Sequence, residues 1–291
     1  MEQILCMFVI SNHHKMTKKI SLLFAFIFFT TICVAQKKEK IKGSKIVTVS
    51  VKEIPAFENI EINDNFEVFL VKSDKPSVEI EADDNLHEII NYEVVGGTLR
   101  VSSLREAIGA KKFAIRINYT SELKLITAKN ESSIKALADL ELENITIKNY
   151  DYSKSFLNVK ANYFALVLND KSEAEINIKA ENSSLELSKN AELKALLTSP
   201  ELKLDMYQKS KAIIEGNTKS AKIRLDNSAE LKSKKFTIAN LILTAENNAK
   251  CEINVSNNFE LEASGKSEIE LFGEPKIEIK KFTNNTTLFK K

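Results

Sequence analysis

Acidic side chains at equivalent positions of a repeating pattern are the residues of this chain with the greatest capacity for chemistry. Each follows a small residue of the repeat by one position: Glu175, Glu192, Glu230 and Glu268. If the repeats stack with these positions in one row, Glu175 and Glu192 lie about 5 Å apart, which suits paired acid catalysis or Ca²⁺ binding. Ile213 and Lys250 interrupt the row, as is typical of an ordinary solvated face. We therefore assign no catalytic, cofactor-binding or metal-ligating residue.

Other catalytic arrangements lack the necessary residues. His87 is the single histidine after residue 35, and Cys251 is the single cysteine there. One histidine and one cysteine cannot make a histidine-based catalytic pair or complete a tetrahedral zinc site. The sequence has no glycine-rich phosphate loop and no serine elbow. Cys251 occupies a position of the apolar pattern, which predicts a small buried side chain.

Aromatic residues concentrate in one stretch and form the candidate binding face. Its predicted members are Tyr150, Tyr152, Phe156 and Tyr163. Side chains of this kind stack on sugar rings or anchor a protein, so the expected partner is a glycan or a cell-envelope or protein surface. Packing of the same side chains against an N-terminal cap is the competing interpretation, and the sequence is compatible with both.

A short pattern recurs through the C-terminal half, in which an aliphatic residue follows a small residue by two positions. It occurs at Ser132/Ile134, Ser155/Leu157, Ala174/Ile176, Ala191/Leu193, Ala212/Ile214, Ala229/Leu231, Ala249/Cys251 and Ser267/Ile269. Successive small residues lie 17 to 23 positions apart. Such self-similarity predicts an all-β fold, a parallel β-helix or solenoid of roughly 8 short coils. The spacing does not decide whether a coil contains one repeat unit or two.

Longer strands with a period of two precede the repeats and predict an N-terminal β-rich cap, interrupted by one helical turn that Asp84 caps. The chain is accordingly divided into five parts. They are a signal peptide (1–35), a flexible lead (36–44), the cap (45–120), the β-solenoid repeats (121–280) and a polar C-terminal tail (281–291) whose lysines blunt the open end.

Residues 1–35 have the layout of a secretory signal peptide. Met16-Thr17-Lys18-Lys19 is a basic start, Ile20 to Ile32 is an uncharged run of 13 residues, and cleavage is expected between Ala35 and Gln36. The run is shorter than the roughly 20 apolar residues of a membrane span, so the mature chain is expected to have none. Met16 is the predicted true start, and a lipid anchor on Cys33 is the alternative to cleavage after Ala35. We expect export to the periplasm, the outer surface or the medium.

Removal of residues 1–35 also removes the net positive charge. The whole chain has 42 basic and 40 acidic residues, and residues 1–35 contain three lysines and one glutamate, which leaves 39 of each. A formal charge of zero gives no reason to expect binding to nucleic acid or to an anionic membrane.

Four motifs ahead of the repeats carry a family resemblance. They are Phe57-x-x-Ile60-x-Ile62, Asn65-Phe66-x-Val68-x-Leu70, Ser77-Val78-x-Ile80-x-Ala82-Asp83-x-Asn85-Leu86 and Glu93-Val94-x-x-Gly97-x-Leu99-x-Val101. With the repeats, they make about residues 45–280 resemble an exported Bacteroidetes family described as putative autotransporter adhesin, head GIN domain. The resemblance implies a β-solenoid with an all-β N-terminal part and supplies no catalytic residues. Family coils often have glycine at the bend, where this chain has Ser, Asn or Ala.

The expected function is that of an exported, non-enzymatic β-solenoid with an adhesin-like or cell-envelope structural role, acting through extended surface contacts. The alternative is a carbohydrate-active enzyme, a polysaccharide lyase or hydrolase that uses surface carboxylates. A periplasmic scaffold component is a third possibility. The sequence leaves the ligand and the oligomeric state open.

Overall fold

The computed structural model describes residues 38–291, so the predicted signal peptide and its cleavage site at Ala35 and Gln36 lie outside the described residues. Residues 40–291 form one structural unit built from strands and one short 3₁₀ helix, η1 (Asp84–Ile89). The strands are β1 (Lys40–Lys42), β2 (Val47–Glu53), β3 (Asn59–Ile62), β4 (Glu67–Lys72), β5 (Ser77–Asp83), β6 (Ile90–Val95), β7 (Thr98–Ser103), β8 (Glu106–Ile108), β9 (Phe113–Tyr119), β10 (Leu125–Ala128), β11 (Ser133–Ala136), β12 (Leu140–Asn149), β13 (Lys154–Leu168), β14 (Glu173–Leu187), β15 (Glu192–Met206), β16 (Lys211–Leu225), β17 (Glu230–Ala245), β18 (Lys250–Ala263), β19 (Glu268–Phe272), β20 (Lys276–Phe282) and β21 (Thr287–Lys290). The predicted all-β solenoid is confirmed, with about nine turns, close to the eight expected.

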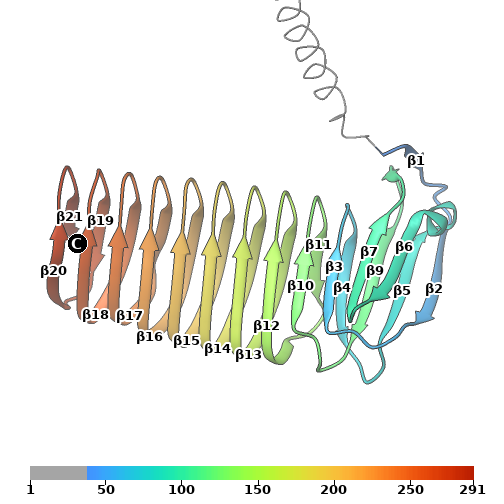
Figure 1. The fold of residues 1–291 in the computed structure, drawn as a ribbon, viewed down its shortest axis with the longest axis horizontal. Coiled ribbons are helices and arrows are strands. Elements are labelled where there is room, and N and C mark those ends of the chain that lie inside the picture. Colours follow the sequence, from blue (N-terminus) through green and yellow to red (C-terminus); the bar gives the residue numbers. More distant parts are fainter. Residues whose placement is uncertain (1–37) are drawn as a thin grey trace, which may run out of the picture. The chain divides into compact units, whose positions relative to one another are not determined.

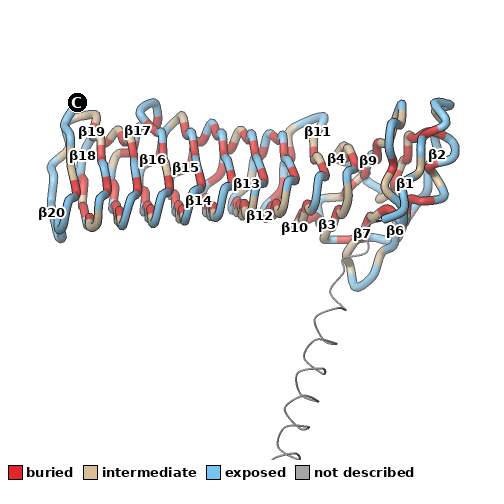
Figure 2. Tube along the Cα trace, turned by 90° about the horizontal axis from the view of Figure 1, so that it is seen from above, coloured by how far each residue is buried: buried red, intermediate tan, exposed pale blue. Residues whose placement is uncertain are grey.

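Each coil has two extended segments, joined by a tight turn at one edge and by a broader bend at the other (Figure 1). In β14, residues 173–179 follow a tight turn, and residues 182–187 lead into the next one. We call the stacked segments that precede the tight turns the pre-turn sheet and those that follow them the post-turn sheet. Successive side chains point to opposite faces of a strand. Inward Leu, Ile and Ala are therefore buried between the two sheets, and Figure 2 shows buried and exposed residues alternating along the tube.

Strand pairing fixes one repeat unit per coil. Lys154 lies beside Glu173, and Glu173 lies beside Glu192, so that the register advances by 19 residues in both of these steps. Parallel neighbours of this kind lie about 4.8 Å apart. Outward residues separated by one coil length therefore form straight rows along the stack.

The small residues of the sequence pattern belong to two inward rows, Ala174 and Ala212 to one and Ala191 to the turn row before it, so their spacing is uneven while the coil length stays nearly constant. Large and small side chains also alternate between two inward rows of the post-turn sheet. Leu193 lies between Ala174 and Ala212 in the first row, while Ala195 lies between Ile176 and Ile214 in the second. Each coil of this stretch thus contributes one large and one small side chain, and the large one alternates between the rows. The volume of each core layer is conserved by this alternation.

The N-terminal strands cover one end of the stack. The coil made by β3 and β4 pairs with β10 and β11 on one side and with β7 and β9 on the other, all in parallel. Beyond them the pairing becomes antiparallel, β6 on β7 and β5 on β9, with β2 on β5. At the other end, β20 and β21 continue the stack through Lys290.

Asp83 connects three loops at the capped end. It precedes η1 without making a side-chain cap, and Asp84, the expected cap, is the first residue of η1. The fully buried Asp83 carboxylate instead accepts hydrogen bonds from the backbone N–H groups of Lys45, Lys111 and Lys112, at 2.8 to 3.1 Å. Burial by itself raises the pKa of Asp83, but these backbone donors outweigh it and hold the pKa below its ordinary value of 3.8.

The tight turns depend on left-handed backbone conformations. One residue of each turn has a positive φ, usually Asn or Asp, which adopt this conformation more readily than other side chains. These residues are Asp64, Asn130, Asp151, Asp170, Lys189, Gln208, Asn227, Asn247, Gly265 and Asn284. At Gly265, a Cβ atom would lie 2.6 Å from the Cα atom of Asn247 in the preceding turn, so glycine is required there.

Candidate binding surface

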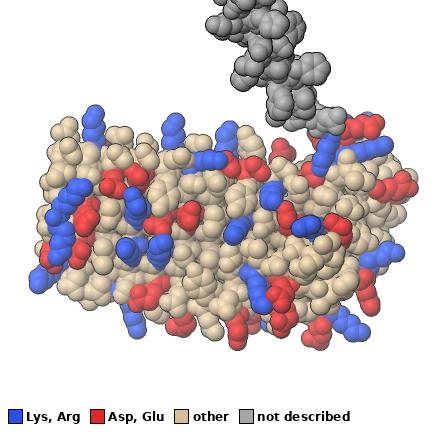
Figure 3. Space-filling model, viewed as in Figure 1, with Lys and Arg blue, Asp and Glu red and all other residues tan. Residues whose placement is uncertain are grey.

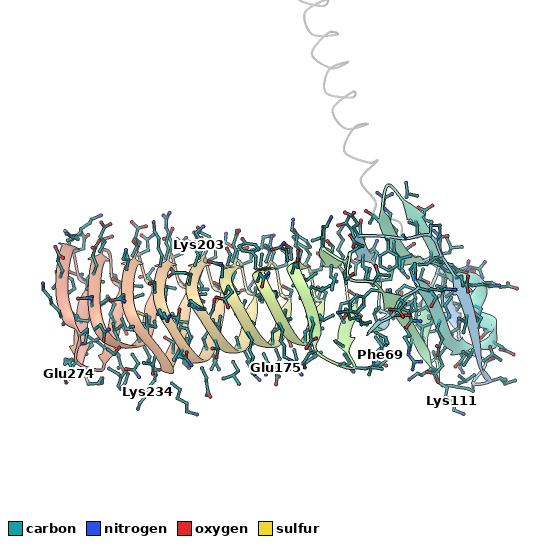
Figure 4. All side chains as sticks on the ribbon, turned by 90° about the horizontal axis from the view of Figure 1, so that it is seen from below. Phe69, Lys111, Glu175, Lys203, Lys234 and Glu274 are labelled. Atoms are coloured by element: carbon teal, nitrogen blue, oxygen red, sulfur yellow. The ribbon has the colours of Figure 1, made fainter. Side chains whose placement is uncertain are left out.

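The four predicted aromatic residues do not form one surface. Tyr150 and Tyr152 belong to a tight turn, Phe156 points outward from the post-turn sheet, and Tyr163 lies beyond the bend, where β13 enters the pre-turn sheet. Figure 4 shows how the two sheets face away from each other, since Phe69 and Glu175 of the post-turn sheet lie along one side and Lys203 of the pre-turn sheet on the other. Phe156 is thus separated from Tyr163 by the thickness of the solenoid.

Tyr152 has its own partner in the neighbouring turn. Lys171 places its Nζ atom 5.1 Å from the centre of the Tyr152 ring and donates a hydrogen bond of 3.2 Å to the phenolic oxygen. The exposed tyrosine is therefore partly covered by a lysine from the next coil, which reduces the flat area it offers to a ligand.

The expected pairing of Glu175 with Glu192 is wrong. The register places Glu192 beside Glu173 and places Glu175 beside Lys194, because the outward acidic residues belong to two rows rather than one. Glu173 is in turn in an ion pair with Lys154, with 2.9 Å between Nζ and Oε2. Across residues 38–291, no group of three or more Asp, Glu, His or Cys side chains could hold a metal ion.

One outward row of the post-turn sheet mixes apolar and charged side chains. In register, this row contains Phe69, Lys135, Phe156, Glu175, Lys194, Ile213 and Lys232. Phe156 and Ile213 are exposed and lie three coils apart, or about 14 Å at the spacing of parallel strands. Leu196, exposed in the adjacent outward row, lies two residues beyond Lys194 on the same strand.

These side chains border two adjoining hollows, one on each side of the row. The first has a volume of about 210 Å³ and reaches Glu173, Glu192 and Lys211; the second, about 500 Å³, reaches Asn177 and Leu196. Phe156, Glu175, Lys194 and Ile213 border both. We call the combined surface the post-turn trough. The row between the hollows has an apolar residue at each end and an acid and a base between them, so the surface can bind a partner by stacking and by hydrogen bonds together.

A larger groove follows the bend edge near the start of the regular coils. Its volume is about 1170 Å³, and charged residues of successive coils, including Glu141, Lys160 and Lys179, line it. Lys160 forms ion pairs with Asp139 at 2.8 Å and with Glu141 at 2.9 Å. These partners raise the pKa of Lys160, and its hydrogen bond lowers the pKa of Asp139. Because Lys160, which lines it, is already paired with carboxylates, this groove is a weaker candidate than the trough.

The sequence identified part of the trough. Phe156 and Ile213 are apolar residues at outward positions of the alternation, and the pattern alone indicates both of them. A search for apolar residues at outward positions misses Leu196, because all three residues of the run Ala195-Leu196-Leu197 are apolar and the alternation does not indicate which of them points outward. In the structure Leu197 is buried and Leu196 is half exposed.

The thiol of Cys251 and the imidazole of His87 are each constrained by their surroundings in the fold. Cys251 is buried among the inward rows, and burial raises the pKa of its thiol to about 12, so the thiol stays protonated at neutral pH. His87 on η1 contacts the hydroxyl groups of Thr48 at 2.9 Å and Ser50 at 3.5 Å on β2.

Among the helices of residues 38–291, none is long and apolar enough to cross a membrane.

Comparison with known proteins gives a family and a fold. The family described as "Putative auto-transporter adhesin, head GIN domain" matches residues 56–275. No curated protein matches the chain. Among solved structures, a "putative adhesin" from Parabacteroides distasonis ATCC 8503 has a TM-score of 0.67 at 17% identity and covers 87% of this chain and 100% of its own. A "putative lipid binding protein" from the same organism has a TM-score of 0.63 at 17% identity, over 87% of this chain and 99% of its own. At these identities the likeness establishes the solenoid fold.

Proposed function

The chain belongs to the family described as "Putative auto-transporter adhesin, head GIN domain", and on that premise we propose that it is an exported, non-enzymatic binding protein whose post-turn trough attaches to a glycan or protein surface of a cell. The observation that carries the proposal is the pair of exposed apolar residues, Phe156 and Ile213, with Glu175 and Lys194 between them in one outward row.

The geometry suits attachment rather than the capture of a small molecule. The hollows of the trough are shallow and open onto a flat sheet, whereas a small-molecule site encloses most of its ligand. A rigid row at a spacing of about 4.8 Å presents successive contacts to an extended partner, and many weak contacts add up through avidity. The extended-contact role expected from the sequence is consistent with this arrangement.

The enzymatic alternative has no specific support in the described residues. A lyase or hydrolase on this scaffold needs convergent acids that are free to react. Of the two neighbouring acids at the trough, Glu173 is in an ion pair with Lys154 and Glu192 lies beside Lys211. Location on the outer surface, rather than in the periplasm, is part of the proposal because an adhesin must reach its partner.

The test measures binding of the purified protein to glycan arrays and to immobilised cells. The double variant Phe156→Ala/Ile213→Ala should lose at least tenfold in apparent affinity with an unchanged melting temperature, because both side chains are exposed. Ile242→Ala is the matched control, since Ile242 is 45% exposed on the pre-turn sheet and Ile213 is 43% exposed on the post-turn sheet.

Two outcomes separate the candidate surfaces. Loss of binding in Ile242→Ala as large as in the double variant would remove the trough from consideration. The triple variant Tyr150→Ala/Tyr152→Ala/Tyr163→Ala should retain binding, because its residues lie at the turn and bend edges. Binding that depends on these tyrosines, and not on Phe156 and Ile213, would move the site to the edges of the coils.

A further inference from the structure

In the part of the chain that the structure describes, the C-terminal end of the stack has an uncovered core. In β18, the inward residues Phe259, Leu261 and Ala263 are buried, whereas their neighbours in the next coil, Ile277, Ile279 and Phe282, are 41%, 51% and 41% exposed. Every residue of β20 is exposed, as the tube in Figure 2 shows at that end. Within residues 38–291, β20 pairs with β18 along one edge only, so its other edge has free backbone donors and acceptors.

This end differs from the N-terminal end, which antiparallel strands cover. Figure 3 shows a group of basic side chains at the end where Figure 1 labels β20. Lys280 contacts Glu278 at 2.5 Å, and Lys290 reaches Glu274 at 2.7 Å. Lysines on an edge strand discourage indiscriminate pairing with other strands. An occupant of this edge must therefore provide carboxylates opposite the lysines and apolar groups opposite the exposed core.

We propose that the occupant is a second copy of this chain, docked end to end about a two-fold axis with the two β20 strands antiparallel. The sequence of β20 fits itself in this arrangement. When Ile277 faces Phe282 of the second copy, Glu278 faces Lys281 of the second copy, and the symmetry repeats both contacts.

The register keeps each side chain on its proper face. Ile277 and Phe282 both continue inward rows, while Glu278 and Lys281 continue the outward rows of Glu260 and Glu262. The bulge that makes this possible is in the structure, since the pairing shifts between Leu261 and Glu262 and leaves Lys280 as the extra residue. In these two pairs apolar groups meet apolar groups and each acid meets a base, while nearest the two-fold axis Ile279 lies opposite the bulged Lys280 of the second copy.

The size of the interface sets the expected strength. A strand of seven residues is about 23 Å long, and two sheets with their outward side chains are about 20 Å thick, which gives about 450 Å² per copy and about 900 Å² in total. Interfaces of this size belong to the weak class. The dimer should therefore form in the micromolar range rather than persist at nanomolar concentration.

Sedimentation velocity over a concentration series tests the pairing. The purified protein should change from monomer to dimer between about 1 and 100 µM. Glu278→Lys or Lys281→Glu alone should weaken the dimer at least tenfold, because each places like charges opposite each other, and the double variant should recover to within about threefold. Glu186→Lys is the control, since Glu186 is an exposed outward residue in mid-stack. Hydrogen exchange gives a second readout, in which the β20 amides become protected as the concentration rises.

Each alternative result overturns the proposal. A monomer throughout the series means that the end does not self-associate. A dimer that Glu186→Lys weakens as much as Glu278→Lys, or that the charge swap fails to restore, forms through another surface. Because the trough lies on the post-turn sheet, these results are independent of the binding proposed there.

Discussion

The alternating core rows predict that Leu193 and Ala195 cannot exchange positions. Leu193 is 1% exposed and lies between Ala174 and Ala212, so Leu193→Ala leaves three alanines in a line and a cavity that its neighbours cannot fill. Loss of three carbon atoms at about 0.8 kcal/mol each, with a cavity contribution, gives about 3 kcal/mol of destabilisation. For a domain of this size that corresponds to a decrease in melting temperature of roughly 6–12 °C.

The double variant Leu193→Ala/Ala195→Leu is the decisive comparison. It has the same composition as the natural chain, but it places a leucine between Ile176 and Ile214 while the alanine line remains. Overpacking adds about 1–3 kcal/mol, so the double variant should be no more stable than Leu193→Ala. Urea unfolding followed by far-UV circular dichroism measures both, with the midpoint and slope reported because repeat arrays depart from two-state behaviour.

Leu196→Ala provides the matched control on the same strand. Leu196 points outward and is half exposed, so its truncation should change the stability by no more than about 0.5 kcal/mol. The reasoning from alternating rows is refuted if the double variant recovers to within about 1 kcal/mol of the stability of the natural protein. It is also refuted if Leu196→Ala and Leu193→Ala lower the free energy of unfolding by the same amount.

Three further predictions concern polar groups of the fold. Asn149 and Ser155 are buried and hydrogen bonded to each other at 2.8 Å, so Ser155→Ala alone should cost about 1–3 kcal/mol in thermal unfolding, whereas Asn149→Leu/Ser155→Ala should be neutral or stabilising; an additive loss would contradict this. Gln208 has a φ of 60°, so Gln208→Asn should stabilise by about 0.5–1 kcal/mol while Gln208→Ala should not; equal effects would show that the turn is unstrained. The pKa of Asp83 is lowered below 3.8 in the folded protein. The ionised carboxylate therefore stabilises the fold fully above pH 3.8, and this stabilisation is lost as the pH falls through the folded-state pKa. The difference in melting temperature between the natural protein and Asp83→Asn should therefore shrink below about pH 4, with Asp74→Asn as an exposed control, and a constant difference would disprove the assignment.

The solenoid could be predicted from the sequence because its causes are local. Inward and outward residues alternate along each short strand, and polar turn residues such as Asp170 and Asn227 recur at each coil. Those features require no knowledge of which strands are neighbours.

The alignment of the coils could not be predicted so well. In the sequence the small residues resemble one repeated position, yet Ala174 and Ala212 belong to the row of Leu193, whereas Ala191 belongs to the turn row of Ser172. A shift of two residues preserves the inward and outward pattern, so hydrophobicity gives no warning of it. That shift produced the wrong pairing of Glu175 with Glu192, and only backbone pairing reveals that Glu175 lies beside Lys194.

The exposed core at β20 illustrates a second limit. Ile277-x-Ile279 has the same apolar pattern as Leu241-x-Leu243 in β17, and nothing in the local sequence distinguishes an inner coil from the last one. Burial of an inward row depends on whether another coil follows, which is a property of the assembly rather than of the strand.

The central claim is that residues one coil length apart form straight rows about 4.8 Å per step along the stack. Distances between pairs of spin labels measure this spacing directly, in a protein whose Cys251 is replaced by alanine. One pair of labels is attached to cysteines introduced at Lys154 and Glu268, which are six coils apart. The second pair is attached at Lys154 and Glu230, which are four coils apart. The account predicts backbone separations of about 29 Å and about 19 Å, a difference set by two coils. Separations that do not increase in proportion to the number of coils would contradict it.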